Sequence, residues 1–80
     1  MAVKLVFLGR LADLAGAPER AVEAPLDWVS LVEGLEGPLG DAVAGDKVLL
    51  AVNGRVLSEK TALFASDGDE VALLPPVSGG

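Results

Sequence analysis

The 80-residue chain contains no cysteine and no histidine. The lack of cysteine excludes a disulfide framework, a thiol nucleophile and a thiolate zinc site. The lack of histidine removes the commonest general base and metal ligand. Most familiar catalytic constellations are therefore excluded, and we expect a protein that is not an enzyme on its own and that binds neither a metal nor a cofactor.

Basic residues and long apolar runs are also scarce. The chain has 6 Lys or Arg against 12 Asp or Glu, a net charge of −6, so nucleic acid is a poor partner. Electrostatic steering would favour a basic patch on a protein partner, although a charge that only maintains solubility explains the composition equally well. The apolar run 48–52 is too short to cross a bilayer, and no signal-like segment precedes residue 3. We expect a soluble, cytoplasmic protein without a membrane partner.

Two apolar strands and two helices stand out in the pattern. Residues 3–8 carry apolar side chains on both faces, which predicts a central strand, and residues 20–24 alternate as an outer strand does. Residues 10–15 predict a short helix closed by a glycine. Residues 28–36 predict the main helix, with Asp27 as its N-cap.

The second half of the chain is punctuated by turns. Residues 39–46 contain two glycines after a Gly-Pro stop signal and predict a loop. Residues 47–52 predict a strand, and Asn53-Gly54 predicts a hairpin turn. Residues 69–74 predict the last strand. The order is α+β, a mixed sheet of about five strands packed on one main helix, with the first and last strands as central neighbours. Phe7, Trp28 and Phe64 are expected in the core.

The given sequence ends in Pro75-Pro76-Val77-Ser78-Gly79-Gly80. The prolines end a strand and fix the exit of the chain, and glycine can enter narrow clefts. Four extended residues reach about 13 to 14 Å. We expect a folded domain over residues 1–76 and a flexible tail over 77–80 whose terminal carboxylate is the reactive group; a frayed terminus is the alternative.

Residues 67–80 resemble the end of the small, sulfur-carrying subunits of molybdopterin synthase, a family of the ubiquitin-like β-grasp superfamily. The strongest match is Gly68-Asp69-Glu70-Val71 followed by Pro-Pro-Val-x-Gly-Gly. Residues 52–54 and 10–16 support it, and the resemblance covers essentially the whole chain. It implies a β-grasp fold with a short helix after the first strand.

The resemblance also implies a chemistry at the Gly80 carboxylate, with Gly79 allowing the tail to thread into a partner. An ATP-dependent adenylating enzyme similar to ubiquitin-activating enzymes activates the carboxylate, and a sulfur donor protein converts it to a thiocarboxylate. The large subunit of the synthase then receives the tail, and the sulfur enters the dithiolene of molybdopterin. The sulfur is carried covalently, and all catalytic side chains belong to the partners.

By the same resemblance, a partner-binding patch comprises Leu8, Val56 and Leu74, together with the tail residues Pro75, Pro76, Val77 and Ser78. For a strand leucine, simple core packing is the alternative. The chain has Leu73-Leu74 where other members have Phe-Phe, and Ala12 where others have Arg. Three other functions stay open: a sulfur carrier for thiazole (thiamine) biosynthesis, a ubiquitin-like modifier conjugated through Gly80, and a binding module with an inert tail.

Overall fold

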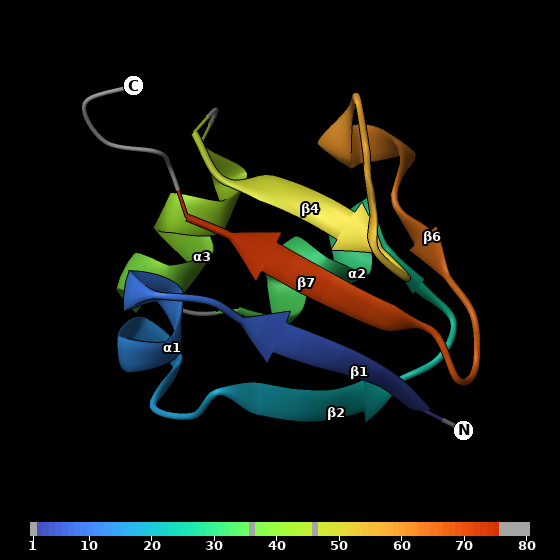
Figure 1. The fold of residues 1–80 in the computed structure, drawn as a ribbon, viewed down its shortest axis with the longest axis horizontal. Coiled ribbons are helices and arrows are strands. Elements are labelled where there is room, and N and C mark those ends of the chain that lie inside the picture. The colour runs from blue at the N-terminus through green and yellow to red at the C-terminus, as the bar shows by residue number, and fades with distance from the viewer. Residues whose placement is uncertain (1, 36, 46, 76–80) are drawn as a thin grey trace.

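The fold is an α+β arrangement of one five-stranded sheet with helices on one side (Figure 1). The computed structural model describes residues 2–35, 37–45 and 47–75. In chain order its elements are β1 (Ala2–Phe7), α1 (Arg10–Ala15), β2 (Glu19–Glu23), β3 (Leu26–Asp27), α2 (Trp28–Gly34), α3 (Gly37–Ala44), β4 (Leu49–Val52), β5 (Arg55–Val56), a 3-10 turn (Lys60–Ala62), β6 (Phe64–Ala65) and β7 (Glu70–Leu74).

The large sheet is mixed and has the strand order β2-β1-β7-β4-β5. β1 and β7 run parallel, whereas β2, β4 and β5 each pair antiparallel with a neighbour. The first and last strands are therefore central neighbours, as the apolar patterns predicted. A separate pair, β3 with β6, was not predicted, because each of these strands is only two residues long.

The core lies between the sheet and the helices that Figure 1 shows behind it. Alternation along the strands turns one set of side chains toward the helices, and these are at most 2% exposed: Val3, Leu5, Phe7, Leu50, Val71 and Leu73. Leu31 from α2 and Val43 from α3 pack against them from the other layer. Trp28 is partly buried, but Phe64 is 63% exposed. The expectation of a core Phe64 is wrong because its neighbour Ala65 takes the inward position on β6.

The ends of the first two helices follow the local sequence signals. α1 ends at Gly16, whose φ of 78° is the left-handed cap. Asp27 caps α2 by accepting a hydrogen bond from the Ser30 amide at 2.8 Å, and this bond lowers the pKa of Asp27 below its usual value. Leu35 is extended, so α2 ends at Gly34, earlier than predicted.

The expected loop over residues 39–46 is wrong, because most of it forms α3. A proline in the first turn of a helix loses no internal hydrogen bond, so Pro38 starts the helix instead of breaking it. Gly40 serves close packing: a Cβ there would lie 2.4 Å from the Leu35 carbonyl oxygen. At the other end, the Lys60 ammonium donates to the carbonyls of Val43 and Gly45. A cation at the carbonyl end stabilises a helix, and this one comes from a distant segment.

Two turns are fastened to each other at the far end of the sheet. Asn53 and Gly54 have φ values of 50° and 86°, which confirms the predicted hairpin. The Asn53 side chain donates to Asp69 at 3.0 Å and accepts from the Glu70 amide at 2.9 Å. Asp69 also accepts from the Ser66 amide, which is the main reason that its pKa is lowered. The acidic turn thus serves as a set of acceptors for backbone and amide donors.

Candidate functional site

The candidate site is the place where the chain leaves the sheet. β7 lies between β1 and β4, and it ends at Leu74. Pro75 follows it and is the last described residue, so we refer to Leu74 and Pro75 as the tail root. The other predicted tail residues, Pro76, Val77, Ser78, Gly79 and Gly80, lie outside the described residues. The division at residue 76 and the role of the tail stay predictions.

The tail root is held by the connection between β1 and α1. The Leu8 amide donates to the Leu73 carbonyl oxygen at 3.2 Å. Gly9 lies under Pro75: it has a φ of +56°, and a Cβ added to it would lie 3.2 Å from the Pro75 Cγ. Both the backbone angle and the close approach favour glycine here. Sequence reasoning missed Gly9, and its only signal was a glycine between a strand and a helix.

The side of the sheet away from the helices, the open face, carries two apolar rows that cross several strands. The strand register aligns the residues of each row. Leu49 pairs with Leu74 across β4 and β7. In the parallel strands β1 and β7, Phe7 pairs with Leu73, so the next residues along, Leu8 and Leu74, are also neighbours. The first row is therefore Leu8, which directly follows β1, with Leu74 on β7 and Leu49 on β4. The second row, one step further from the tail root, is Val6, Ala72, Ala51 and Val56.

Several side chains of these rows are accessible to a partner. Leu8 is 40% exposed, Leu49 44% and Val56 52%, while Leu74 is half-buried between its neighbours. The structure thus brings the three predicted patch residues Leu8, Val56 and Leu74 onto one face, and simple core packing does not describe Leu8 or Val56. Contiguous exposed apolar patches commonly mark interaction sites. Sequence reasoning missed Leu49, because residues 48–52 are all apolar and their sequence does not reveal which of them face outward.

The opposite end of the open face is ionic. Lys4 lies 3.4 Å from Glu19 and 3.9 Å from Glu70, and all three side chains are about half exposed. Such exposed pairs stabilise a fold little. Because these charged side chains occupy one end of the open face, only the half beside the tail root is apolar.

A groove between α1 and α3 adjoins the tail root on the helix side. It has a volume of about 500 Å³, and its lining includes Leu11, Leu14, Val48 and Pro75. Within residues 2–35, 37–45 and 47–75, no cluster of three or more carboxylates is placed to hold a metal ion. None of the helices in that part of the chain has the length and apolar character needed to span a membrane.

The sheet order, the single helical layer and the exit of the last central strand define a protein of the β-grasp class. A solved Haloferax volcanii protein superposes with a TM-score of 0.78 and 25% identity over 100% of this chain and 87% of its own. A subunit in the protein-protein complex of subunits 1 and 2 of molybdopterin-converting factor from Helicobacter pylori superposes with a TM-score of 0.68 and 26% identity, with both chains covered fully. SAMP1 from Haloferax volcanii has a TM-score of 0.71 at 24% identity, with full coverage of both chains.

The sequence comparisons agree with the fold. The model of the ThiS family matches residues 5–80, and the chain belongs to that family. The molybdopterin synthase sulfur carrier subunit of Escherichia coli is 33% identical over 82 residues, which cover 98% of this chain and 99% of that protein. The subunit of the same name from Drosophila melanogaster is 30% identical over 81 residues, 98% of this chain and 90% of its own. The resemblance drawn from residues 67–80 and the predicted β-grasp fold are confirmed.

Proposed function

We propose that this protein is the sulfur carrier subunit of a molybdopterin synthase and that it acts through the carboxylate of Gly80. The observation that carries the proposal is the row Leu8, Leu74 and Leu49, which is exposed beside the tail root. A partner that covers this row is placed to receive the tail, whose last four residues span about 13 to 14 Å when extended. The names of the relatives from two distant organisms support the same role.

The chemistry follows from the weakness of a carboxylate as an electrophile, since it is ionised and has no good leaving group. In a partner enzyme, the Gly80 carboxylate attacks ATP and forms an acyl-adenylate with release of pyrophosphate. A persulfide on a sulfur donor protein then attacks the acyl carbon and displaces AMP. A thiol cleaves the sulfur–sulfur bond of the acyl persulfide and leaves the thiocarboxylate. In the large subunit, the thiocarboxylate sulfur attacks the pterin precursor.

This chain contributes binding and orientation to these steps, and the partners contribute the catalytic groups. Gly79 and Gly80 carry no side chain beyond Cα, so the tail can enter a narrow channel. The close approach of Gly9 to Pro75 supports a role for these two residues in directing the tail. The apolar rows supply the contact area that holds the tail in the partner, and in such interfaces a few buried anchors contribute most of the affinity.

The proposed partners are a large synthase subunit, an ATP-dependent adenylating enzyme and a sulfur donor protein, all in the cytoplasm. The Helicobacter pylori relative was solved in complex with subunit 2, which supports the first of these. Both the large subunit and the adenylating enzyme need to hold the same tail. We therefore propose that both cover the same apolar half of the open face and that they bind in turn.

Intact mass spectrometry tests the sulfur carrier directly. After incubation with its native adenylating enzyme, sulfur donor and ATP, the chain is expected to gain the mass of one oxygen-to-sulfur exchange. Deletion of Gly80, or a tag added after it, abolishes the gain, whereas a tag before Met1 preserves it. A C-terminally tagged chain that still supports molybdopterin synthesis would support the inert-tail module instead.

Two alternatives use the same tail. A sulfur carrier for thiazole biosynthesis would also use a thiocarboxylate. A ubiquitin-like modifier is the other alternative, and the similarity of this fold to that of SAMP1 is consistent with it. Complementation separates the two carriers: rescue of a strain that lacks its molybdopterin synthase small subunit is expected, and rescue of a thiazole-requiring strain is not. Higher-mass conjugates that disappear when Gly80 is deleted would favour the modifier.

A further inference from the structure

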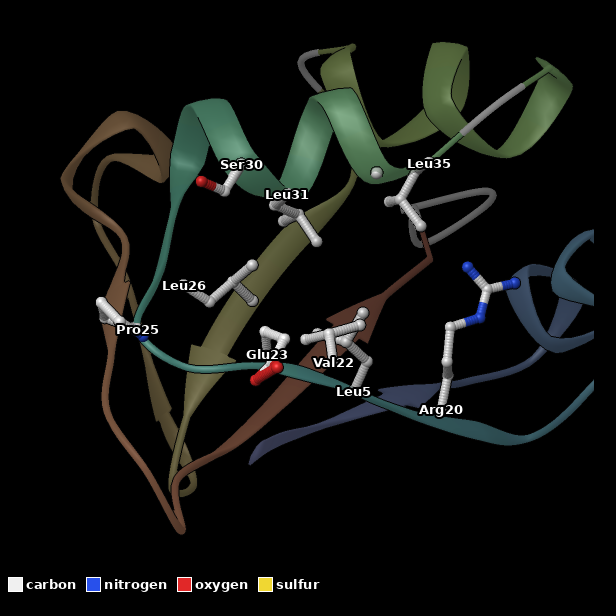
Figure 2. Close-up of a pocket in the computed structure, with 10 residues that line it drawn as sticks. Leu5, Arg20, Val22, Glu23, Pro25, Leu26, Ser30, Leu31 and Leu35 are labelled. Atoms are coloured by element: carbon white, nitrogen blue, oxygen red, sulfur yellow. The ribbon is translucent and has the colours of Figure 1, made fainter. Parts of the chain in front are cut away.

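A second cleft lies between the edge strand β2 and helix α2 (Figure 2). Its volume is about 230 Å³. The floor is apolar and includes Leu5, Val22, Leu26 and Leu31, and Arg20 rises at one end of it, as Figure 2 shows. The Arg20 guanidinium carbon lies 5.7 Å from the centre of the Phe7 ring, on the side of the sheet that the helices cover.

The strand beside this cleft has an open hydrogen-bonding edge. In the described residues, β2 pairs with β1 alone. The Phe7 amide donates to the Pro18 carbonyl oxygen at 2.8 Å, and antiparallel pairs alternate between bonded and non-bonded. The backbone groups of Arg20 and Val22 therefore point to β1, and those of Glu19 and Ala21 point away from the sheet. Such an edge is a template for a further strand.

Gly34 keeps the cleft open on the helix side. It is the last residue of α2 and lines the cleft. Its φ lies outside the left-handed region, and a Cβ added to it would meet no atom within 4 Å. Neither the backbone angle nor a close contact requires glycine here, and glycine is a poorer helix former than alanine. Because Gly34 has no side chain, it leaves space beside the open edge of β2.

We propose that β2 and this cleft bind an extended peptide segment of another protein, which adds to the sheet as a sixth, antiparallel strand. Main-chain hydrogen bonds give such strand addition its affinity, and pockets for alternate side chains give its specificity. Pro18 and Pro25 flank β2, so the paired stretch is about five residues long. This site does not depend on the proposed function.

The charges of β2 define the partner's sequence. Arg20 and Val22 face the helix side, so an acidic and an apolar residue fit opposite them; Glu19 and Glu23 face the other side, so basic residues fit there. Read from its N-terminus, the partner segment has the pattern Lys-Ile-Thr-Glu-Lys. A second copy of this chain does not fit, because antiparallel pairing of β2 with itself about Ala21 places Glu19 opposite Glu23, and like charges directly opposite are destabilising.

The position of the cleft allows this docking while the tail is in use. β1 separates β2 from β7, so two members of the apolar row, Leu74 and Leu49, lie beyond β1, and the third, Leu8, directly follows β1. A segment on the β2 edge leaves that row uncovered. One partner can therefore hold the protein by its edge strand while another receives the tail.

Nuclear magnetic resonance titration of the isotopically labelled chain tests the site. The probe is a synthetic peptide with Lys-Ile-Thr-Glu-Lys at its centre, and its control has the reversed charges, Glu-Ile-Thr-Lys-Glu. We expect saturable shifts in the amide signals of residues 19–23 and 34. Because three cross-strand charge pairs turn from attractive to repulsive, the control is expected to bind about tenfold more weakly.

Two variants make the test specific. At Gly34 an added Cβ meets no atom within 4 Å, so Gly34→Leu is expected to occupy the cleft and abolish peptide binding, whereas Glu33→Leu, on the neighbouring exposed position, preserves it. Arg20→Glu reverses the preference in favour of a peptide with Lys in place of Glu. The proposal is overturned if the peptide causes no shifts at residues 19–23 at about 1 mM, if the two peptides bind equally, or if Gly34→Leu binds as the parent does.

Discussion

Replacing Gly9 by alanine tests whether the tail root is fixed by the glycine beneath it. Gly9 has φ 56° and ψ −131°, a region that a side chain makes costly. Such strained backbone costs about 2 to 3 kcal/mol. In addition, the new methyl group would lie 3.2 Å from the Pro75 Cγ and would displace Pro75 by a few tenths of an ångström.

Gly16→Ala is the matched control for this change. Gly16 also has a positive φ, 78°, but its ψ of 8° is the milder left-handed helical region, and a Cβ there would meet nothing within 4 Å. Its backbone cost is about 1 to 2 kcal/mol. For a domain of this size, each kcal/mol lowers the melting temperature by roughly 4 to 8 °C. We expect Gly9→Ala to melt about 10 to 20 °C below the parent and Gly16→Ala about half as far below it.

The assay combines thermal unfolding, followed by circular dichroism, with the rate of thiocarboxylate formation at a temperature where both variants are folded. Only Gly9→Ala is expected to slow that reaction, because only this variant redirects the tail. An unchanged melting temperature for Gly9→Ala would refute the backbone argument. Equal reaction rates in the two folded variants would refute the role of Gly9 in aiming the tail.

Three further predictions follow from single contacts. Leu49→Lys is expected to change the free energy of unfolding by less than about 0.5 kcal/mol but to weaken binding to the large subunit by roughly 10- to 100-fold, measured by calorimetry, because it places a charge in the apolar row. Val29→Lys on α2 is the control, since Val29 is also an exposed apolar residue, at 59% against 44% for Leu49. Equal effects of the two changes on binding would contradict the assigned surface. Asn53→Gly keeps the turn but removes two hydrogen bonds, so the free energy of unfolding measured in urea is expected to decrease by about 1 to 3 kcal/mol. An unchanged unfolding midpoint would show that these hydrogen bonds contribute nothing to stability. Because the pKa values of Asp27 and Asp69 are lowered in the folded protein, their contribution to stability is complete above the unfolded pKa of 3.8 and is lost as the pH falls through the lower folded pKa values. The urea concentration at the unfolding midpoint should therefore decrease as the pH falls below 3.8. In Asp69→Asn this decrease should be less steep.

Under the proposed function, the apolar half of the open face is the surface that the partners share. Strand pairing brings its apolar side chains together beside the tail root. The ionic end, with Lys4 between Glu19 and Glu70, limits the apolar surface to the side from which the tail leaves. A partner that binds by apolar contact is thereby oriented toward the tail.

Local signals in the sequence were sufficient for the elements whose shape depends on near neighbours. The Asn53-Gly54 turn, the Asp27 cap and the Gly16 end each rest on a backbone angle or on a hydrogen bond within a few residues. The apolar side chains on both faces of residues 3–8 were sufficient to predict a central strand, which pairs with β2 and β7. The absence of cysteine and histidine, together with the pattern over residues 67–80, favoured the terminal carboxylate as the reactive group.

Long-range contacts decided the rest. Helix α3 could not be predicted from its own residues, because the reason for Gly40 is its close approach to the Leu35 carbonyl, and because the cation at the end of the helix, Lys60, comes from a distant turn. Leu49 could not be told from its apolar neighbours until the pairing of β4 with β7 placed it opposite Leu74. A strand pattern reveals which residues share a face, but only the register between strands reveals which side chains meet. The proposed chemistry is therefore an inference from the tail sequence, whereas the apolar surface beside the tail root exists only in the folded sheet.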